Sequence, residues 1–394
     1  MNTSDNDRSI TRLHWISVAL CMLTFGLIVW GGHVNTTRSG MAFPDWPTSN
    51  AAPMLTYAPS EWLTVPDRFW EHGHRLFASV VGLVTVLVLL VSYRSIPRER
   101  RAGKSIMALD GFIFLVVATA LVGINSMPGG FMEAVMTLLA VCLAAFLVRA
   151  SREKDAVRVH WLAQAAFVGV CLQACFGGYT VRNNLPDWTS TTHGMLAEIY
   201  FMIVIGIALL TSKAWRNQQR GGRIATAGRT TTMIVCTTWA LTFVQFFLGA
   251  LTRHTDAWGV STSFPQWSDE GFFPSSELLQ YAQVVIHLTH RTTAYVVALL
   301  VVIQWVMIWR RRSDFRRVAL TSTAALVLVF VQILLGAAIL WTARGELATT
   351  LHVMTGVVLL ALNTITMYTM LRFHVAPSGR ADVMHSVAVG QGSR

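Results

Sequence analysis

Runs of about 20 apolar residues recur along the whole chain, and they restrict the possible folds more than any other feature of the sequence. A helix that rises 1.5 Å per residue needs about this length to cross the hydrocarbon core of a bilayer. Because a backbone in lipid must satisfy its own hydrogen bonds, such runs fold as helices. The composition agrees, since 53% of the residues are hydrophobic and only 13% are charged. The sequence therefore predicts an all-α, polytopic membrane protein.

We expect about ten transmembrane helices. Their predicted ranges are 13–32, 70–93, 106–124, 130–149, 159–181, 191–212, 231–251, 281–309, 318–341 and 347–371. The segment before the first run is short and polar and does not resemble a signal peptide or a transit peptide. The first run is therefore expected to stay in the protein as a membrane anchor.

The net charge of +11 comes mainly from Lys and Arg in alternate connecting segments. This placement excludes a nucleic-acid-binding surface and instead predicts helix orientation by the positive-inside rule, with anionic lipid as a partner. It predicts a multi-pass protein of the cell membrane with both termini in the cytoplasm. The segments 33–69 and 252–280 would then be outer loops, and their tryptophans suit lids at the outer membrane interface.

An internal repeat relates the two halves of the chain. Residues 31–46 contain a glycine pair, a T-R pair and F-P-D-W, and residues 249–267 contain G-A, T-R and F-P-Q-W. The next helix begins with E-H-G-H-R at 71–75 in one half and with H-L-T-H-R at 287–291 in the other. Gln173 precedes His193, and Gln332 precedes His352, by the same 20 residues. Matched motifs of this kind indicate duplication of one structural unit.

The spacing of the repeat predicts the domain organisation. From the histidine of the H-R pair to the glutamine there are 99 residues in the first half and 42 in the second. The excess matches one helical hairpin, so the sequence predicts two pseudo-symmetric four-helix bundles with a hairpin inserted at about 100–158. The N-terminal repeat bundle would cover residues 1–212, the C-terminal repeat bundle 231–371, and a cytoplasmic tail 372–394.

Each predicted bundle has one histidine on its second repeat helix and one on its fourth. Ionisable residues within a membrane are costly and indicate a functional site. Facing histidines in a four-helix bundle can hold a flat macrocycle and bind its iron from both sides. We therefore predict haem iron between His74 and His193, and between His290 and His352. The alternatives are histidines hydrogen-bonded across helices and a zinc site, which lacks thiolate and carboxylate partners around three of the four.

Glu71 occupies the position at which the second half has His287. Residues three apart on a helix share a face, so Glu71 is predicted to point toward the group that His74 binds and to accept a proton there. The alternative is an interfacial glutamate paired with Arg68 or Arg75. The difference between the halves indicates one working site and one electron-relay site.

Several further residues lie near these motifs. Arg75 and Arg291 directly follow the predicted ligands, and they are candidate partners for haem propionates or members of helix-capping salt bridges. Three glycines suit close approach of helices, which is the preferred interpretation, or of a macrocycle; they are Gly177, Gly178 and Gly336. Four histidines lack a repeat partner and are interpreted as interfacial or structural; they are His33, His72, His160 and His254. We assign no role to Glu198.

Together these motifs resemble the haem A synthase family. The resemblance rests on G-G-x-V, T-R-S-G and P-D-W-P within residues 31–47, on E-H-x-H-R at 71–75, and on Q-x-x-x-G-G-x-T-V at 173–181 followed by His193. It continues through H-x-x-H-R at 287–291 and the pair Gln332 and His352. It covers nearly the whole chain except residues 100–158 and the tail.

The resemblance implies a membrane-bound oxidoreductase of haem biosynthesis and cytochrome oxidase assembly. It would oxidise a ring methyl of haem O to a formyl group, giving haem A for terminal oxidases. Haem b would be a cofactor at His290 and His352, haem O the substrate at His74 and His193, and Glu71 the essential glutamate. Haem O synthase and a terminal oxidase subunit would be partners, and the electron donor is unidentified.

The chain also departs from this family and admits other functions. Many bacterial members have a cysteine pair flanking P-D-W-P, whereas residues 42–43 and 48–50 contain no cysteine here, which excludes that disulfide or thiol chemistry. The extra hairpin leaves room for a different substrate or partner. The alternative functions are a dihaem electron-transfer membrane protein and a haem-handling oxidase assembly factor.

Overall fold

The computed structural model describes residues 3–95, 111–112, 115, 130–219, 228–269 and 271–374, and most of them are helical. The N-terminal half contains α1 (Thr3–Thr36), α2 (Pro66–Ser95), α4 (Phe131–Arg152), α5 (Asp155–Arg182), α6 (Asp187–Thr211) and the short α7 (Lys213–Gln219). The C-terminal half contains α8 (Arg229–His254), α9 (Ala282–Trp309), α10 (Arg316–Trp341) and α11 (Glu346–His374).

Within the described residues, nine helices are long and apolar enough to cross a membrane. The prediction of an all-α, polytopic membrane protein is therefore confirmed. The tenth predicted span, 106–124, lies outside the described residues except for positions 111, 112 and 115. Helix α2 begins four residues earlier than its apolar run, because Pro66 suits the first turn of a helix and Asp67 is favourable at its positive end.

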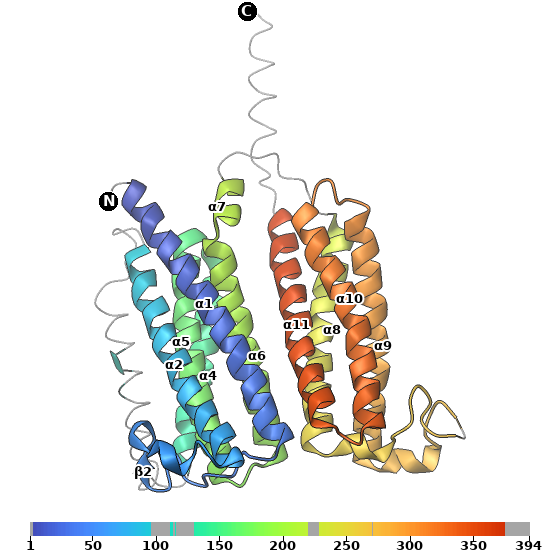
Figure 1. Cartoon of the computed structure of the whole chain (residues 1–394). Coiled ribbons are helices and arrows are strands. Elements are labelled where there is room, and N and C mark those ends of the chain that lie inside the picture. Colours follow the sequence, from blue (N-terminus) through green and yellow to red (C-terminus); the bar gives the residue numbers. More distant parts are fainter. Residues whose placement is uncertain are drawn as a thin grey trace, which may run out of the picture.

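Four helices of the N-terminal half close into a ring (Figure 1). Helix α1 packs against α2 and α6, and α5 packs against the same two helices from the other side. Helix α4 packs mainly on α5. The interior of this half is filled by fully buried aliphatic side chains, among them Leu20, Val88, Val168 and Val204. Burial of these side chains between helices holds the ring together.

The C-terminal half repeats the arrangement with α8, α9, α10 and α11, each packed against two neighbours. The two rings lie side by side, and α1 and α6 of the first contact α8 and α11 of the second (Figure 1). Phe201 and Ile205 of α6 pack with Val357 of α11 in this interface. The two rings of four helices agree with the duplication that the repeat predicts. The exact domain limits 1–212 and 231–371 stay a prediction. In the predicted tail 372–394, residues beyond 374 lie outside the described part.

The two long interhelical loops lie at one end of the protein, opposite the N-terminal end of α1 and the C-terminal end of α11 (Figure 1). The loop between α1 and α2 contains β1 (Thr48–Ser49), paired antiparallel with β2 (Ala52–Pro53), and the 3₁₀ turns Met54–Thr56 and Pro59–Glu61. The loop between α8 and α9 contains the 3₁₀ turns Ala257–Val260 and Ser276–Gln280. The predicted ligand histidines lie in the helices close to this end.

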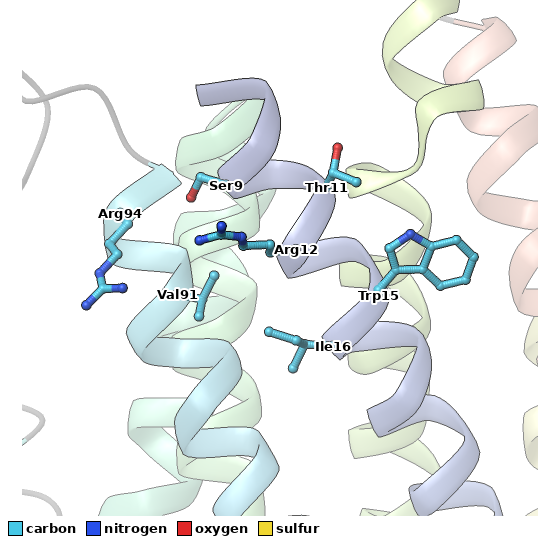
Figure 2. A pocket seen from close by; sticks show the side chains of 7 residues that line it. All are labelled: Ser9, Thr11, Arg12, Trp15, Ile16, Val91 and Arg94. Carbon is cyan, nitrogen blue, oxygen red and sulfur yellow. The ribbon is translucent and has the colours of Figure 1, made fainter. Parts of the chain in front are cut away.

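The opposite end has a hollow of about 410 Å³ between α1 and α2. Figure 2 shows that Arg12 extends from α1 toward α2 above the apolar side chains of Ile16 and Val91. The other residues that line the hollow are Ser9, Thr11, Trp15 and Arg94. Arginine and tryptophan are typical of a helix end at the boundary between lipid and water. The hollow lies at the end of the protein opposite the predicted ligand histidines.

Candidate functional site

Each of the four predicted ligand histidines lies against a glycine of the preceding helix. A Cβ atom on that glycine would approach Cε1 of the imidazole closely in every case. The distances would be 2.8 Å for Gly31 and His74, 3.0 Å for Gly249 and His290, 3.2 Å for Gly177 and His193, and 3.4 Å for Gly336 and His352. Most real Cβ contacts are longer than 3.4 Å. The glycines therefore leave the room in which each imidazole ring lies.

The structure brings the histidines together in the predicted pairs. His74 and His193 are close enough to interact electrostatically, and the same holds for His290 and His352. All four rings lie deep in the protein, yet each residue keeps a partly accessible surface. Among the described residues, the buried Nδ1 has no hydrogen-bond partner in His74, His193 and His352. Each bundle thus has two imidazoles that lie deep in the protein and close to one another.

A glutamine stands four residues before the glycine in three of these helices. Gln245 of α8 donates an amide N–H to the carbonyl oxygen of His290 (3.0 Å), and the same nitrogen lies 3.0 Å from Nδ1 of that ring. Gln332 of α10 donates to the carbonyl oxygen of His352 (2.9 Å). In α1 the equivalent position, four residues before Gly31, is Leu27. The four histidines therefore share a glycine contact but differ in their polar neighbours.

The arginine of each H-R pair, Arg75 or Arg291, holds the outer loop of its own half. Arg75 donates to the carbonyl oxygens of Phe43 (2.8 Å), Asp45 (2.9 Å) and Thr48 (2.9 Å). Its guanidinium also lies over the ring of Phe43, 5.6 Å from the ring centre. The loop of the F-P-D-W motif is thereby fixed to α2.

Arg291 makes the matching contacts in the second half. It donates to the carbonyl oxygens of Ser263, Pro265 and Gln266, each at 3.0 Å. Its guanidinium lies 5.6 Å from the ring centre of Phe264. Both arginines thus donate to carbonyl oxygens of the outer loop of their own half, and their predicted contact with haem propionates stays a prediction.

Glu71 is 3% exposed and forms a buried ion pair with Arg75. Its Oε2 accepts the backbone N–H of Phe43 at 2.9 Å. The alternative interpretation, an ion pair with Arg75, is therefore present in the structure, whereas Arg68 pairs with Glu61 instead. The predicted role of Glu71 as a proton acceptor stays a prediction. His287, at the matching position, is also 3% exposed and lies against the ring of Trp267.

The glycines of α5 and α10 contact side chains. Gly177 and Gly336 contact imidazoles, as described above. A Cβ atom on Gly178 would overlap the indole ring of Trp46, which lies on α5 at this point. The preferred interpretation, close approach of helices, agrees with Gly177 and Gly336, each of which packs against a histidine of the next helix, whereas Gly178 packs against the tryptophan of the outer loop. The loop of the first half is held by α2 through Arg75 and by α5 through Gly178.

The histidines without a repeat partner make hydrogen bonds between elements, which agrees with their structural interpretation. The partners are Thr350 for His33, Ser49 for His72, Ser92 for His160 and Asn35 for His254. Glu198 of α6 is 0% exposed, and neither carboxyl oxygen has a hydrogen-bond partner within the described residues.

In the part of the chain that the structure describes, no three His, Cys, Asp or Glu side chains gather into a metal site. Structural zinc in proteins takes four such ligands, and catalytic zinc takes three. Two imidazoles per bundle instead match the axial ligand set of an iron porphyrin, whose ring supplies the other four donors. The residues present therefore fit a haem better than a bare metal ion.

Two features of this site were not predicted from sequence. One is the contact between glycine and ligand histidine, although Gly177 and Gly336 each precede their histidine by the same 16 residues. The other is the role of the H-R arginines in holding F-P-x-W loops, which the repetition of both motifs in both halves could have indicated.

The fold and the site define an all-α membrane protein with a pair of facing histidines in each of two helical rings. Residues 14–131 and 124–364 match the family described as cytochrome oxidase assembly protein. The chain therefore belongs to this family, and the resemblance to haem A synthases is confirmed.

Curated relatives cover most of the chain. The heme A synthase of Caulobacter sp. (strain K31) is 26% identical over 386 residues, which span 91% of this chain and 96% of the relative. The heme A synthase of Roseobacter denitrificans is 21% identical and covers 85% of this chain and 81% of its own length. That of Cereibacter sphaeroides (strain ATCC 17023) is 24% identical and covers 82% and 78%.

Proposed function

We propose that this chain is a haem A synthase, a membrane-bound oxidoreductase that converts a ring methyl of haem O into a formyl group. The observation that carries the proposal is the set of four glycine-backed histidines, arranged as one pair in each ring. Relatives named heme A synthase that match it over most of their length support the same reaction.

In this proposal the two pairs hold different haems. His74 and His193 bind the substrate haem O, and His290 and His352 bind haem b. Haem b, when bound, supplies one-electron chemistry. The halves differ at Glu71 and His287, and the half with the carboxylate is the one we assign to the substrate. A second difference supports this choice, because Glu198 lies five residues after His193 whereas Val357 lies five residues after His352.

Oxidation of a methyl group to a formyl group breaks two C–H bonds and adds one oxygen atom, and its four electrons pass to an oxidant supplied from outside the chain. A group beside the substrate that accepts a proton would assist the breaking of a C–H bond. Glu71 lies one turn before His74 on α2, and its carboxylate is buried beside the outer loop. We assign proton acceptance to its Oε2, which is held by the N–H of Phe43. Arg75 favours the charged form of this carboxylate and holds it in place, while the loop that Arg75 binds covers the end of the N-terminal helical ring and excludes water.

The proposal includes the cell membrane as the location, with both termini in the cytoplasm. It is supported by the placement of both described chain ends opposite the two long loops (Figure 1) and by the basic segments at the chain ends. Haem O synthase would deliver the substrate, and a terminal oxidase subunit would receive the product.

The test is expression in a host that makes haem O but lacks its own haem A synthase. Extracted pigments are identified by mass, and bound haem is measured on the purified protein. We expect haem A from the wild type and none from Glu71→Gln, which should retain haem b. Glu61→Gln is the matched control, because Glu61 is an exposed glutamate of the loop that precedes α2, and this variant should retain haem A formation.

Other outcomes would favour the alternative functions. A wild type that holds two haems b, forms no haem A and keeps its redox behaviour in Glu71→Gln would be a dihaem electron-transfer protein. A wild type that binds haem O or haem A without converting one into the other would be an assembly factor.

A further inference from the structure

Arg253 lies where the two helical rings meet. It belongs to the last turn of α8, one turn beyond Gly249, which contacts His290. Its Nη2 donates to the carbonyl oxygen of Gly32 and to Oγ1 of Thr36 (2.7 Å), both on α1 of the other ring. This arginine therefore connects the rings near the end at which the histidines lie.

The guanidinium of Arg253 lies deep in the protein without a carboxylate partner in the described residues. Its Nε is buried and has no hydrogen-bond partner in the part of the chain that the structure describes. The nearby carboxylate of Asp256 already pairs with Arg344 (3.0 Å) and faces Arg38 (4.0 Å). Arg344 is also close enough to repel Arg253. Since a buried, unpaired charge is costly, this excess of positive charge indicates that an anionic group binds here.

Two observations place Arg253 beside the haem site of the second ring. Arg253 and His352 interact electrostatically. Gly32, whose carbonyl accepts from Arg253, also packs on the neighbour of His352, because a Cβ atom on Gly32 would lie 3.2 Å from Cγ1 of Val353 and 4.0 Å from Nη1 of Arg253. An anion bound by Arg253 would thus lie near a haem ligated by His352.

We propose that Arg253 binds a propionate carboxylate of the haem held by His290 and His352. The proposal rests on the proposed function, since it requires a haem at this pair. A guanidinium N–H donates a strong, charge-assisted hydrogen bond to a carboxylate, and the buried Nε of Arg253 has no acceptor among the described residues. Arg291, the residue predicted from sequence for this role, instead directs its donors to the α8–α9 loop.

The test compares haem b with its dimethyl ester, in which both propionates have lost their charge. Full-length protein is produced in haem-deficient cells, and the Kd of each haem is measured by absorbance titration. We expect the wild type to bind haem b about tenfold to a hundredfold more tightly than the ester, as one charged hydrogen-bonded pair contributes. Arg253→Gln should reduce this ratio to near one, whereas Arg291→Gln should leave most of it.

Each other outcome has a distinct meaning. If Arg253→Gln keeps the full ratio of the two Kd values, the proposal is wrong. If this variant keeps the ratio and also loses a co-purified anionic phospholipid, the ligand of Arg253 is a lipid phosphate and not a haem propionate. Arg253→Lys, which keeps the charge, checks that the protein still folds and should retain part of the ratio. If His352→Ala binds haem b as tightly as the wild type, the haem site itself is misassigned, and the proposed function fails independently of Arg253.

Discussion

Gly31 of α1 lies directly against the imidazole of His74 on α2, so closely that a Cβ atom would stand 2.8 Å from Cε1 of the ring. Such a contact forces the ring or the helix to move, since real Cβ atoms essentially never come within 3.0 Å of another atom. The position of a predicted haem ligand is thus determined by the absence of a side chain on the neighbouring helix.

Replacement of Gly31 by alanine is expected to displace His74 and to lower haem A formation about tenfold or more, because small misplacement of a reacting group is costly. The amount of bound haem b should be unaffected, since its predicted ligands, His290 and His352, belong to the C-terminal ring of helices. Pigment analysis of the purified variant measures both. Gly82→Ala on α2 is the matched control, because a Cβ atom there meets nothing within 4 Å, and wild-type levels are expected.

The same substitution at the other three glycines should have graded effects. Gly249→Ala brings a Cβ atom to 3.0 Å from its imidazole and should lower haem b content strongly, whereas Gly336→Ala, at 3.4 Å, should lower it little. Gly177→Ala, at 3.2 Å from the ring of His193, should have an intermediate effect on haem O binding. Equal losses of haem b in Gly249→Ala and Gly336→Ala would show that the close contact does not determine ligand position.

Much of the fold follows from the sequence alone. The apolar runs predict nine described helices, because a membrane admits no other use for such segments. The pairing of His74 with His193 and of His290 with His352 follows from their matched places in the repeat. Contacts between particular helix faces were not predicted, because the sequence alone does not show which face of α1 meets α2. The contact of Gly31 with His74 depends on that face.

Arg253 illustrates a second limit. The T-R pairs at 37–38 and 252–253 match in sequence, so Arg38 and Arg253 look equivalent. Once the structure shows that Gly249 and Gly31 are the equivalent glycines, the two arginines differ in position. Arg253 lies four residues after Gly249, whereas Arg38 lies seven residues after Gly31. Arg38 is exposed and faces Asp256, whereas Arg253 lies inside. Carbonyl acceptors in an irregular loop have no residue pattern of their own, so only the repetition of the H-R and F-P-x-W motifs in both halves could have indicated that Arg75 holds the loop.

The buried pair of Glu71 and Arg75 gives a prediction on stability. Arg75→Gln removes the partner of a buried carboxylate and leaves loop carbonyls unpaired, so we expect a loss of about 3 kcal/mol or more. Glu71→Gln alone leaves the guanidinium its three carbonyl acceptors and should cost less. The double variant should be more stable than the sum of the single losses implies, because neither charge is then left unpaired. Thermal unfolding in detergent measures the cycle, and strict additivity would mean that the pair contributes no coupling.

The outer loop gives a prediction on pH, through Asp45. Its carboxylate accepts the N–H groups of Asn50 (3.0 Å) and Ala51 (2.8 Å). Partial burial alone would raise the pKa of Asp45, but hydrogen bonds from the Thr48 hydroxyl and from these N–H groups outweigh it and hold the pKa below its usual value. A carboxyl group whose pKa is lowered by folding stabilises the folded form above its unfolded pKa of about 3.9, and this contribution is lost as the pH falls through the folded pKa.

We therefore expect the loop at residues 37–65 to be firmly held at pH 6 and to loosen below about pH 4, near the ordinary pKa of aspartate. Limited proteolysis with an acid-tolerant protease, or hydrogen exchange of the loop amides, measures the change. Asp45→Asn keeps the shape of the side chain but accepts fewer hydrogen bonds and does not titrate, so its loop should already be loosened at pH 6 and respond less to acid. Thr56, which bonds only to a carbonyl within its own turn, offers the control Thr56→Val, whose loop should retain the acid response. If Asp45→Asn loosens with acid as much as the wild type does, the titration belongs to another group, because this turn is then held without the charge of Asp45.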